Sequence, residues 1–134
     1  MILSGKSIED IIGKGLLKVS PKPQVKEASI KVFLSSKIGK ERNNYKDFKE
    51  YELQPKEFVL ALSQEHFEFS EDYSGLYDNH IHISSFGVFT HMGSMLIEPK
   101  FKGQILLEIY NASDKPFKLK AGMRVGNLMI VPVK

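Results

Sequence analysis

Short runs of alternating apolar and polar residues recur along most of the chain, and each run predicts a β-strand. In the segment 28–34, ASIKVFL, one face of the expected strand is apolar, formed by Ala28, Ile30, Val32 and Leu34. Similar patterns occupy 57–64, 66–69, 81–85, 86–91, 94–98, 103–111, 117–120 and 123–133. Many short strands at close spacing favour an all-β barrel or sandwich.

Only the start of the chain has a helical pattern. Ser7 and Asp10 have the spacing of a capping box, the isoleucines at 8, 11 and 12 share one face, and glycines follow at 13 and 15. The proline-containing segment 20–23 is expected to be an extended loop. The polar segment 37–50 is interpreted as a long loop or flap, and 111–114 and 121–122 have turn chemistry.

Length and composition narrow the class of protein. With 134 residues and 42% hydrophobic content, the chain is expected to form one domain, 1–134, with a real core. The absence of cysteine excludes disulfides, zinc ribbons and thiol catalysis. No run approaches the roughly 20 apolar residues of a membrane helix, and the N-terminus lacks a secretion-signal pattern. We therefore expect a cytoplasmic protein that does not contact membranes.

The net charge of +3 is a mild excess and does not favour nucleic acid as a partner. Its distribution is uneven, because residues 1–50 hold 11 basic and 6 acidic residues while 51–134 hold 8 and 10. No acidic residue follows Asp114, whereas five basic ones do. This basic stretch could meet phosphate, or it could simply be a solvated face.

One carboxylate stands out within the expected strands. In 103–111, GQILLEIYN, Glu108 shares a face with Leu106 and Tyr110, opposite a face of aliphatic residues. A carboxylate partly removed from water is suited to general acid–base catalysis. The alternative is a glutamate on a solvated face, free or in an ion pair. Apolar residues on both faces also suggest that this strand packs against the core and against a neighbouring subunit.

The histidines offer a weaker candidate site. In an extended segment His80 and His82 would point the same way, and with His91 they could bind a metal, although surface or core packing is the commoner role of such a pair. Ser84 and Ser85 lie near these histidines, but no nucleophile-elbow pattern surrounds them. HExxH, P-loop and GxGxxG patterns are absent, so the prediction is that no metal is bound.

The segment 74–111, SGLYDNHIHISSFGVFTHMGSMLIEPKFKGQILLEIYN, resembles the dCTP deaminase branch of the dUTPase-like superfamily. That family has Asp-Gly-Arg-Ser-Ser-Leu-Ala-Arg-Leu-Gly, a hairpin, Ile-Asp-Pro and Leu-Glu-Phe-Tyr-Asn in this order. The N-terminal MILSGKSIEDIIGKGLLKVSP and the C-terminal FKLKAGMRVGNLMIVPV are similar to the family's ends. The resemblance covers most of the chain, except the 37–50 segment.

The resemblance implies a distorted β-barrel or jelly-roll of the dUTPase-like type, with one short N-terminal helix and nucleotide sites between the subunits of a homotrimer. Glu108 would activate the water that attacks C4 of cytosine, without a metal. The hairpin, with Thr90, Met92, Gly93 and Ser94, would contact the pyrimidine through backbone groups. Glu98 stands where the family has an Asp near the deoxyribose. The ligand would be a pyrimidine nucleotide or a related small molecule, with Mg²⁺ only if a triphosphate binds.

Several positions depart from the family. The Arg-Ser-Ser that holds the triphosphate is His80, Ile81 and His82 here, and the second Arg is Ser85. The Asp of the early strand motif is Lys31, and the sequence stops at Lys134, before the tail that covers the nucleotide in the family. Each lost charge-assisted phosphate bond would cost about 1.5–3 kcal/mol, unless the basic C-terminal residues compensate.

Three hypotheses stay open. The chain could be a divergent dCTP deaminase or dUTP pyrophosphatase that uses Glu108. It could be a catalytically degenerate homotrimer that binds a smaller ligand or a protein. The third and weakest hypothesis is a metal-binding protein that uses His80, His82 and His91.

Overall fold

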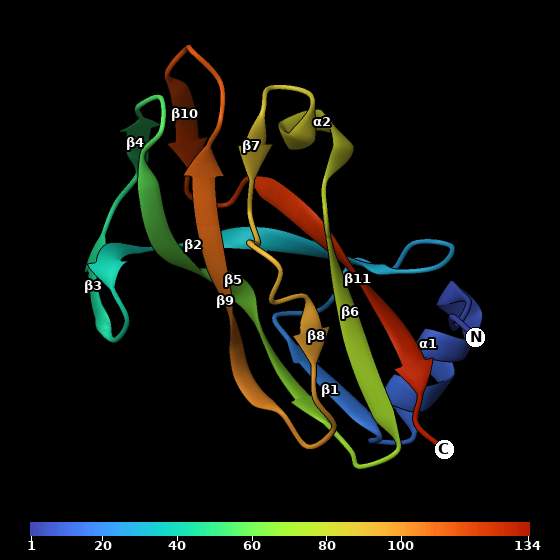
Figure 1. Cartoon of the computed structure of the whole chain (residues 1–134). Coiled ribbons are helices and arrows are strands. Elements are labelled where there is room, and N and C mark those ends of the chain that lie inside the picture. Colours follow the sequence, from blue (N-terminus) through green and yellow to red (C-terminus); the bar gives the residue numbers. More distant parts are fainter.

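The computed structural model describes residues 1–134, the whole of the printed sequence (Figure 1). Its helices and strands are α1 (Gly5–Gly13), β1 (Leu17–Ser20), β2 (Ile30–Glu41), β3 (Asn44–Asp47), β4 (Glu50–Leu53), β5 (Phe58–Phe69), β6 (Tyr73–Asn79), α2 (Ile81–Ser84), β7 (Val88–Phe89), β8 (Leu96–Ile97), β9 (Lys102–Asn111), β10 (Phe117–Lys120) and β11 (Arg124–Pro132). The chain is mainly β, as the strand patterns predicted.

Nine of the strands form one antiparallel sheet that curls into a distorted half-barrel. Its order is β7-β9-β5-β2-β11-β6-β8, with β1 added to β5 and β3 added to β2, while β4 and β10 form a separate pair. A cluster of 23 buried apolar residues fills the inside of the curl. The alternation predicted for β9 is confirmed, because Ile105, Leu107 and Ile109 all lie in this cluster. The N- and C-termini lie on the same side as α1 (Figure 1).

The N-terminal helix is confirmed, but its cap is not Ser7. Helix α1 begins at Gly5, and the side chain of Ser4 accepts a hydrogen bond of 3.2 Å from the backbone N–H of Ser7. Ile8 and Ile11 are buried against the barrel. The predicted start was three residues late because Ser4 and Ser7 are both good capping residues and the packing of the helix selects between them.

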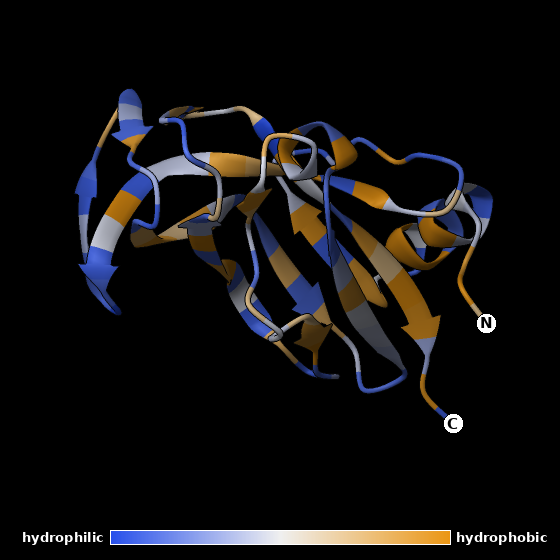
Figure 2. Cartoon of the chain, turned by 45° about the horizontal axis from the view of Figure 1, so that its top comes forward, coloured by the Kyte–Doolittle hydropathy of each residue, from blue (hydrophilic) through white to orange (hydrophobic).

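The polar segment 37–50, expected to be a long loop, is a β-hairpin. Strand β2 continues to Glu41, turns, and pairs with β3, where Lys37 lies opposite Asp47 and Ile38 opposite Lys46. Figure 2 shows that this end of the sheet is mostly hydrophilic, whereas the barrel strands alternate. The prediction failed because Ile38 supplies almost the only buried side chain here, so the hydrophobic period was too weak to indicate strands.

The segment 81–85, expected to be a strand, is the one-turn helix α2. Backbone N–H groups of Ser84 and Ser85 donate to the carbonyls of His80 and Ile81 at 3.0 and 2.9 Å. The alternation of apolar and polar residues wrongly predicted a strand. Only Ile83 is buried, and one buried residue is compatible with a helical turn as well as with a strand. The expected strands 86–91 and 94–98 shorten to the two-residue β7 and β8.

Two further boundaries differ from expectation. The segments 57–64 and 66–69 are one strand, β5, whose register with β9 shifts between Leu62 and His66. Within this irregular stretch Glu65 is buried, and its Oε1 accepts the Phe33 N–H at 3.1 Å. Ala28, predicted on the core face, lies before β2 and is exposed.

Candidate functional site

Glu108 projects from β9 on the face of the sheet that points away from the barrel core. Its neighbours in sequence are fully buried on the inner face, while Leu106 and Tyr110 share the outer face with it. Leu60 on β5 lies directly opposite Glu108 and is only 7% exposed. Glu108 is therefore half-buried beside apolar side chains, a position between the partly desolvated and the solvated alternatives that the sequence left open.

The segment between β7 and β8 lies against Glu108. The Met92 N–H donates to Glu108 Oε1 at 3.3 Å, and the Glu108 N–H donates to the Thr90 carbonyl at 3.2 Å. Met92, Gly93 and Ser94 are exposed beside it. The expected base-reading hairpin is a loop here, because β7 pairs with β9 and β8 pairs with β6 rather than with each other. The structure brings this 90–94 loop and the expected general base together, and it leaves the second carboxylate oxygen of Glu108 without a partner in the chain.

Thr90 anchors this 90–94 loop through a buried polar network. Its side-chain oxygen lies 2.8 Å from the hydroxyl of Tyr77, and its backbone N–H donates to Asn79 Oδ1 at 2.8 Å. The amide of Asn79 also donates to the Val88 carbonyl at 2.9 Å. Burial raises the pKa of Tyr77, so its hydroxyl stays neutral and able to donate. Because the N–H and side chain of Thr90 are used internally, Met92, Gly93 and Ser94 carry the backbone groups nearest the open side.

Glu98 lies on a different part of the sheet from Glu108. It follows β8, which pairs with β6, and its side chain is exposed, whereas Glu108 lies on β9 between β7 and β5. The expected role of Glu98 beside a sugar therefore remains a prediction.

The four residues at the expected phosphate loop occupy α2 and its ends. His80 caps the helix and donates its N–H to the Val125 carbonyl at 3.0 Å. Ile81 is 79% exposed, the ring of His82 packs edge-on against Phe86, and the Ser85 hydroxyl donates to the His82 carbonyl. Burial, reinforced by the nearby Arg124, lowers the pKa of His80, so its imidazole is neutral at pH 7.

A metal centre formed by the histidines is not supported. His80 and His82 have ring centroids 6.3 Å apart, whereas His91 packs edge-on against Tyr77. No group of three or more His, Cys, Asp or Glu side chains is arranged to hold a metal ion.

Neither helix of the structure has the length and apolar character that crossing a bilayer requires.

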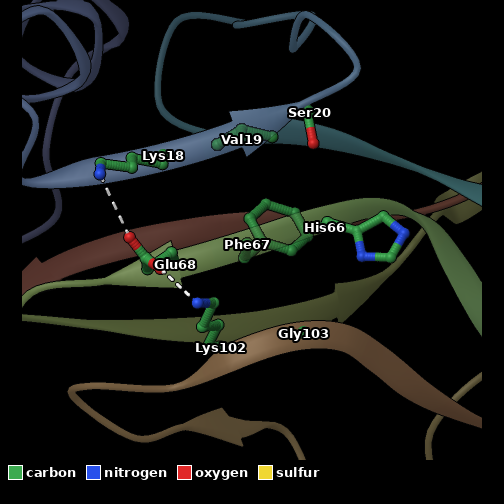
Figure 3. A pocket seen from close by; sticks show the side chains of 8 residues that line it. All are labelled: Lys18, Val19, Ser20, His66, Phe67, Glu68, Lys102 and Gly103. Atoms are coloured by element: carbon green, nitrogen blue, oxygen red, sulfur yellow. Dashed lines mark ion pairs between the residues drawn. The ribbon is translucent and has the colours of Figure 1, made fainter.

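One hollow of the chain lies at the other end of β9. It measures about 340 Å³ and crosses β1, β5 and β9, where Lys18 and Lys102 both point toward Glu68 (Figure 3). The two N–O distances are 3.4 and 3.3 Å, and the lysines lower the pKa of Glu68. Glu68 offsets one of the two lysine charges on an open surface, and the hollow is lined by none of the Glu108 or 90–94 residues, so it is not the candidate site.

Sequence reasoning missed the two residues that hold the 90–94 loop, Tyr77 and Asn79. Both lie on β6, which was not among the predicted strands, so the inward position of Tyr77 was not predicted. Asn79 carried a signal, because it stands where the resembling family has a glycine. An amide there can bond to β7 and Thr90 together, which a glycine cannot.

Comparison with known proteins agrees with this arrangement. The model of a family described as dCTP deaminase-like matches residues 2–133. A curated dUMP-forming dCTP deaminase from Aquifex aeolicus is 30% identical over 145 residues, covering 96% of this chain and 80% of that protein.

Two solved structures share the fold. A 2'-deoxycytidine 5'-triphosphate deaminase from Agrobacterium tumefaciens has a TM-score of 0.80 at 17% identity, covering 99% of this chain and 48% of that one. A mutant dUTPase from phage phi11 of S. aureus, described with a structural Mg(II) ion, has a TM-score of 0.67 at 16% identity, covering 88% and 91%.

This chain spans about half the length of the Agrobacterium protein. The likeness to the two structures shows the fold, whereas the family model and the Aquifex relative cover nearly all of the sequence. These two matches agree with the half-barrel and with the 90–94 loop at Glu108. We conclude that the chain belongs to the dCTP deaminase-like family.

Proposed function

We propose that this protein deaminates a pyrimidine deoxynucleotide, dCTP in the first instance, with Glu108 as general base. The observation that carries the proposal is the pairing of Glu108 with the Met92 N–H, which fixes one carboxylate oxygen and leaves the other free for a water molecule. We take dCTP as the first substrate to test because the similar proteins are named as dCTP deaminases.

In this reaction the free oxygen of Glu108 accepts a proton from water as the water oxygen bonds to C4 of cytosine. The addition leaves an electron pair on N3, and N3 takes this proton from Glu108. The C4 hydroxyl then gives its proton through Glu108 to the amino nitrogen as the C4–N bond breaks and ammonia departs. The products are a uracil nucleotide protonated at N3 and ammonia, so both protons of water are placed and the carboxylate is regenerated. Apolar neighbours such as Leu60 and Leu106 limit the access of bulk water to the carboxylate.

A homotrimer is part of this proposal. The outer face around Glu108 carries Phe58, which is 40% exposed, Phe89, which is 49% exposed, and Tyr110, which lies opposite both. A neighbouring copy that covers this apolar face would also cover the exposed residues of the 90–94 loop. Light scattering coupled to size-exclusion chromatography tests this assembly, and a monomer at assay concentration contradicts it.

The activity test follows ammonia and uracil nucleotides after addition of dCTP, and pyrophosphate after addition of dUTP. We expect Glu108→Gln to lower turnover roughly 10²- to 10⁴-fold, because the amide cannot accept the proton. The matched control is Glu71→Gln, which makes the same change at an exposed turn. Absence of turnover with dCTP, dUTP and other pyrimidine nucleotides refutes the proposal.

A second candidate function is a catalytically degenerate homologue that binds a nucleoside, a monophosphate or a protein. It is favoured by the loop at His80–His82, where Ile81 is exposed and His80 is neutral, so the family's charged phosphate donors are missing. Calorimetry with deoxycytidine and dCMP, in a preparation without turnover, would support it. Turnover that disappears in Glu108→Gln rejects it.

A further inference from the structure

Positive charge gathers on the outer face of the sheet where β2, β11 and α2 meet. Lys31 on β2 lies opposite Asn127 on β11, so the two side chains share that face. Arg124 lies opposite Phe33 on the same two strands, and its guanidinium donates to Asn127 Oδ1. His80 is fixed beside them by its hydrogen bond to the Val125 carbonyl.

These cations have no acidic partner in the chain. Lys31 donates to the amide oxygen of Gln24 at 3.2 Å, and neither Lys31 nor Arg124 takes part in an ion pair. The Nε of Arg124 is fully buried and has no hydrogen-bond partner. Buried donors of this kind are rare, and with no acid bonded to it the positive charge of Arg124 is uncompensated within the chain.

Two acids lie near this cluster. Asp78 lies opposite Asn127 on the β6 side and is exposed, and the buried Glu65 accepts the backbone N–H of Phe33, the residue opposite Arg124. Neither acid forms an ion pair with Lys31 or Arg124. The positive charge of the cluster reaches His80, whose pKa is lowered by burial first and then by Arg124, His82 and Lys31. The local field favours an anion and disfavours a further cation.

A magnesium ion does not fit this donor set. Mg²⁺ takes near-octahedral oxygen ligands, usually including one or two carboxylates. Here the position of the family's early-strand Asp is held by the ammonium of Lys31, and no cluster of three acidic or histidine side chains exists. The phi11 phage dUTPase is described with a structural Mg(II) ion, for which this chain offers no cluster of three acidic or histidine ligands.

We infer that Lys31 and Arg124 act as a built-in counter-charge that binds a polyphosphate directly, so that the anionic part of the ligand is held without a divalent metal. The identity of that ligand as a nucleotide rests on the proposed function. The binding of a polyphosphate does not, because it needs only the two cations.

Isothermal titration with inorganic tripolyphosphate, in excess EDTA and in excess MgCl₂, tests the inference. We expect binding in EDTA that Mg²⁺ does not tighten. Lys31→Asp should weaken binding in EDTA roughly tenfold or more, since a charge-assisted contact is replaced by a repulsive one. Lys46→Asp is the matched control, because Lys46 is an exposed lysine on β3 without an ion pair. If Lys31→Asp fails to fold, Lys31→Gln removes the charge alone and should weaken binding likewise.

Binding that appears only with Mg²⁺, no binding in EDTA, or equal loss in Lys31→Asp and Lys46→Asp overturns the inference. A separate titration with dCTP isolates the proposed function. If tripolyphosphate binds without metal while dCTP is neither bound nor deaminated, the inference stands and the proposed function fails.

Discussion

Gly126 on β11 allows two strands to approach more closely than any other residue would permit, and Gly126→Ala should be strongly destabilising. A Cβ atom at this position would lie 2.3 Å from the Tyr77 hydroxyl oxygen, 2.4 Å from its Cζ and 2.6 Å from the Asp78 carbonyl oxygen. The carbonyl belongs to β6, whose backbone is paired with β11 over seven residues. Tyr77 is 1% exposed and bonded to Thr90, so neither obstacle can move freely.

The expected cost follows from these contacts. Overpacking a filled core costs about 1–3 kcal/mol, and a clash with both a backbone carbonyl and a buried ring belongs at the upper end. Displacing Tyr77 also threatens its hydrogen bond to Thr90, which is worth about 1 kcal/mol. We therefore expect the free energy of unfolding to fall by about 3 kcal/mol and Tm by roughly 10 °C.

Urea denaturation and a thermal scan at matched protein concentration measure this change. The control is Gly13→Ala at the end of α1, where an added Cβ meets no atom within 4 Å. That variant should be neutral or stabilising by up to about 1 kcal/mol. A loss below about 1 kcal/mol for Gly126→Ala, or equal losses in both variants, would refute the reasoning from close approach.

Three other variants test the core, the helix cap and a buried acid. Leu107→Ala should lower the free energy of unfolding by about 2–5 kcal/mol in urea titration, because Leu107 is fully buried in β9. Ser4→Ala should cost about 1 kcal/mol and exceed the cost of Ser7→Ala, since Ser4 is the acceptor at the helix start. Burial raises the pKa of Glu65, so its stabilising contribution is complete below pH 4.5 and is lost as pH rises through its native pKa. Glu65→Gln should therefore gain stability relative to wild type from pH 4.5 toward neutrality, and a constant difference across that range contradicts this.

Strands β2, β5, β9 and β11 were predictable in large part because each buries an apolar face. Strands β1 and β6 were not predicted, and the inward positions of β6 include Ser74 and Gly75, which give no hydrophobic alternation. Strand β9 alternates so regularly that its inner and outer residues follow from the sequence, whereas the exposure of Glu108 was left open. The hairpin of β2 and β3 was missed because hydrogen bonding to a neighbour, rather than burial, makes it a strand. The same limit applies to α2, because a single buried isoleucine is compatible both with the two-residue period of a strand and with the 3.6-residue period of a helix.

The candidate site was predicted only in part. The residues around Glu108 and in the 90–94 segment resembled a family motif, and in the structure the Met92 N–H donates to Glu108. The roles of Tyr77 and Asn79 could not be predicted, because their side chains find hydrogen-bond partners only where β6 lies beside β7 and the 90–94 loop.

By itself, then, the sequence determined the class of fold, the core faces of the long strands and the family. The tertiary structure alone decided which polar groups meet. Lys31, His80 and Arg124 are up to 93 positions apart in the chain and were singled out for separate reasons, yet strand pairing sets them on one surface. Local patterns report how each residue partitions between water and core, whereas contacts between distant residues depend on sheet order and register, which no local pattern contains.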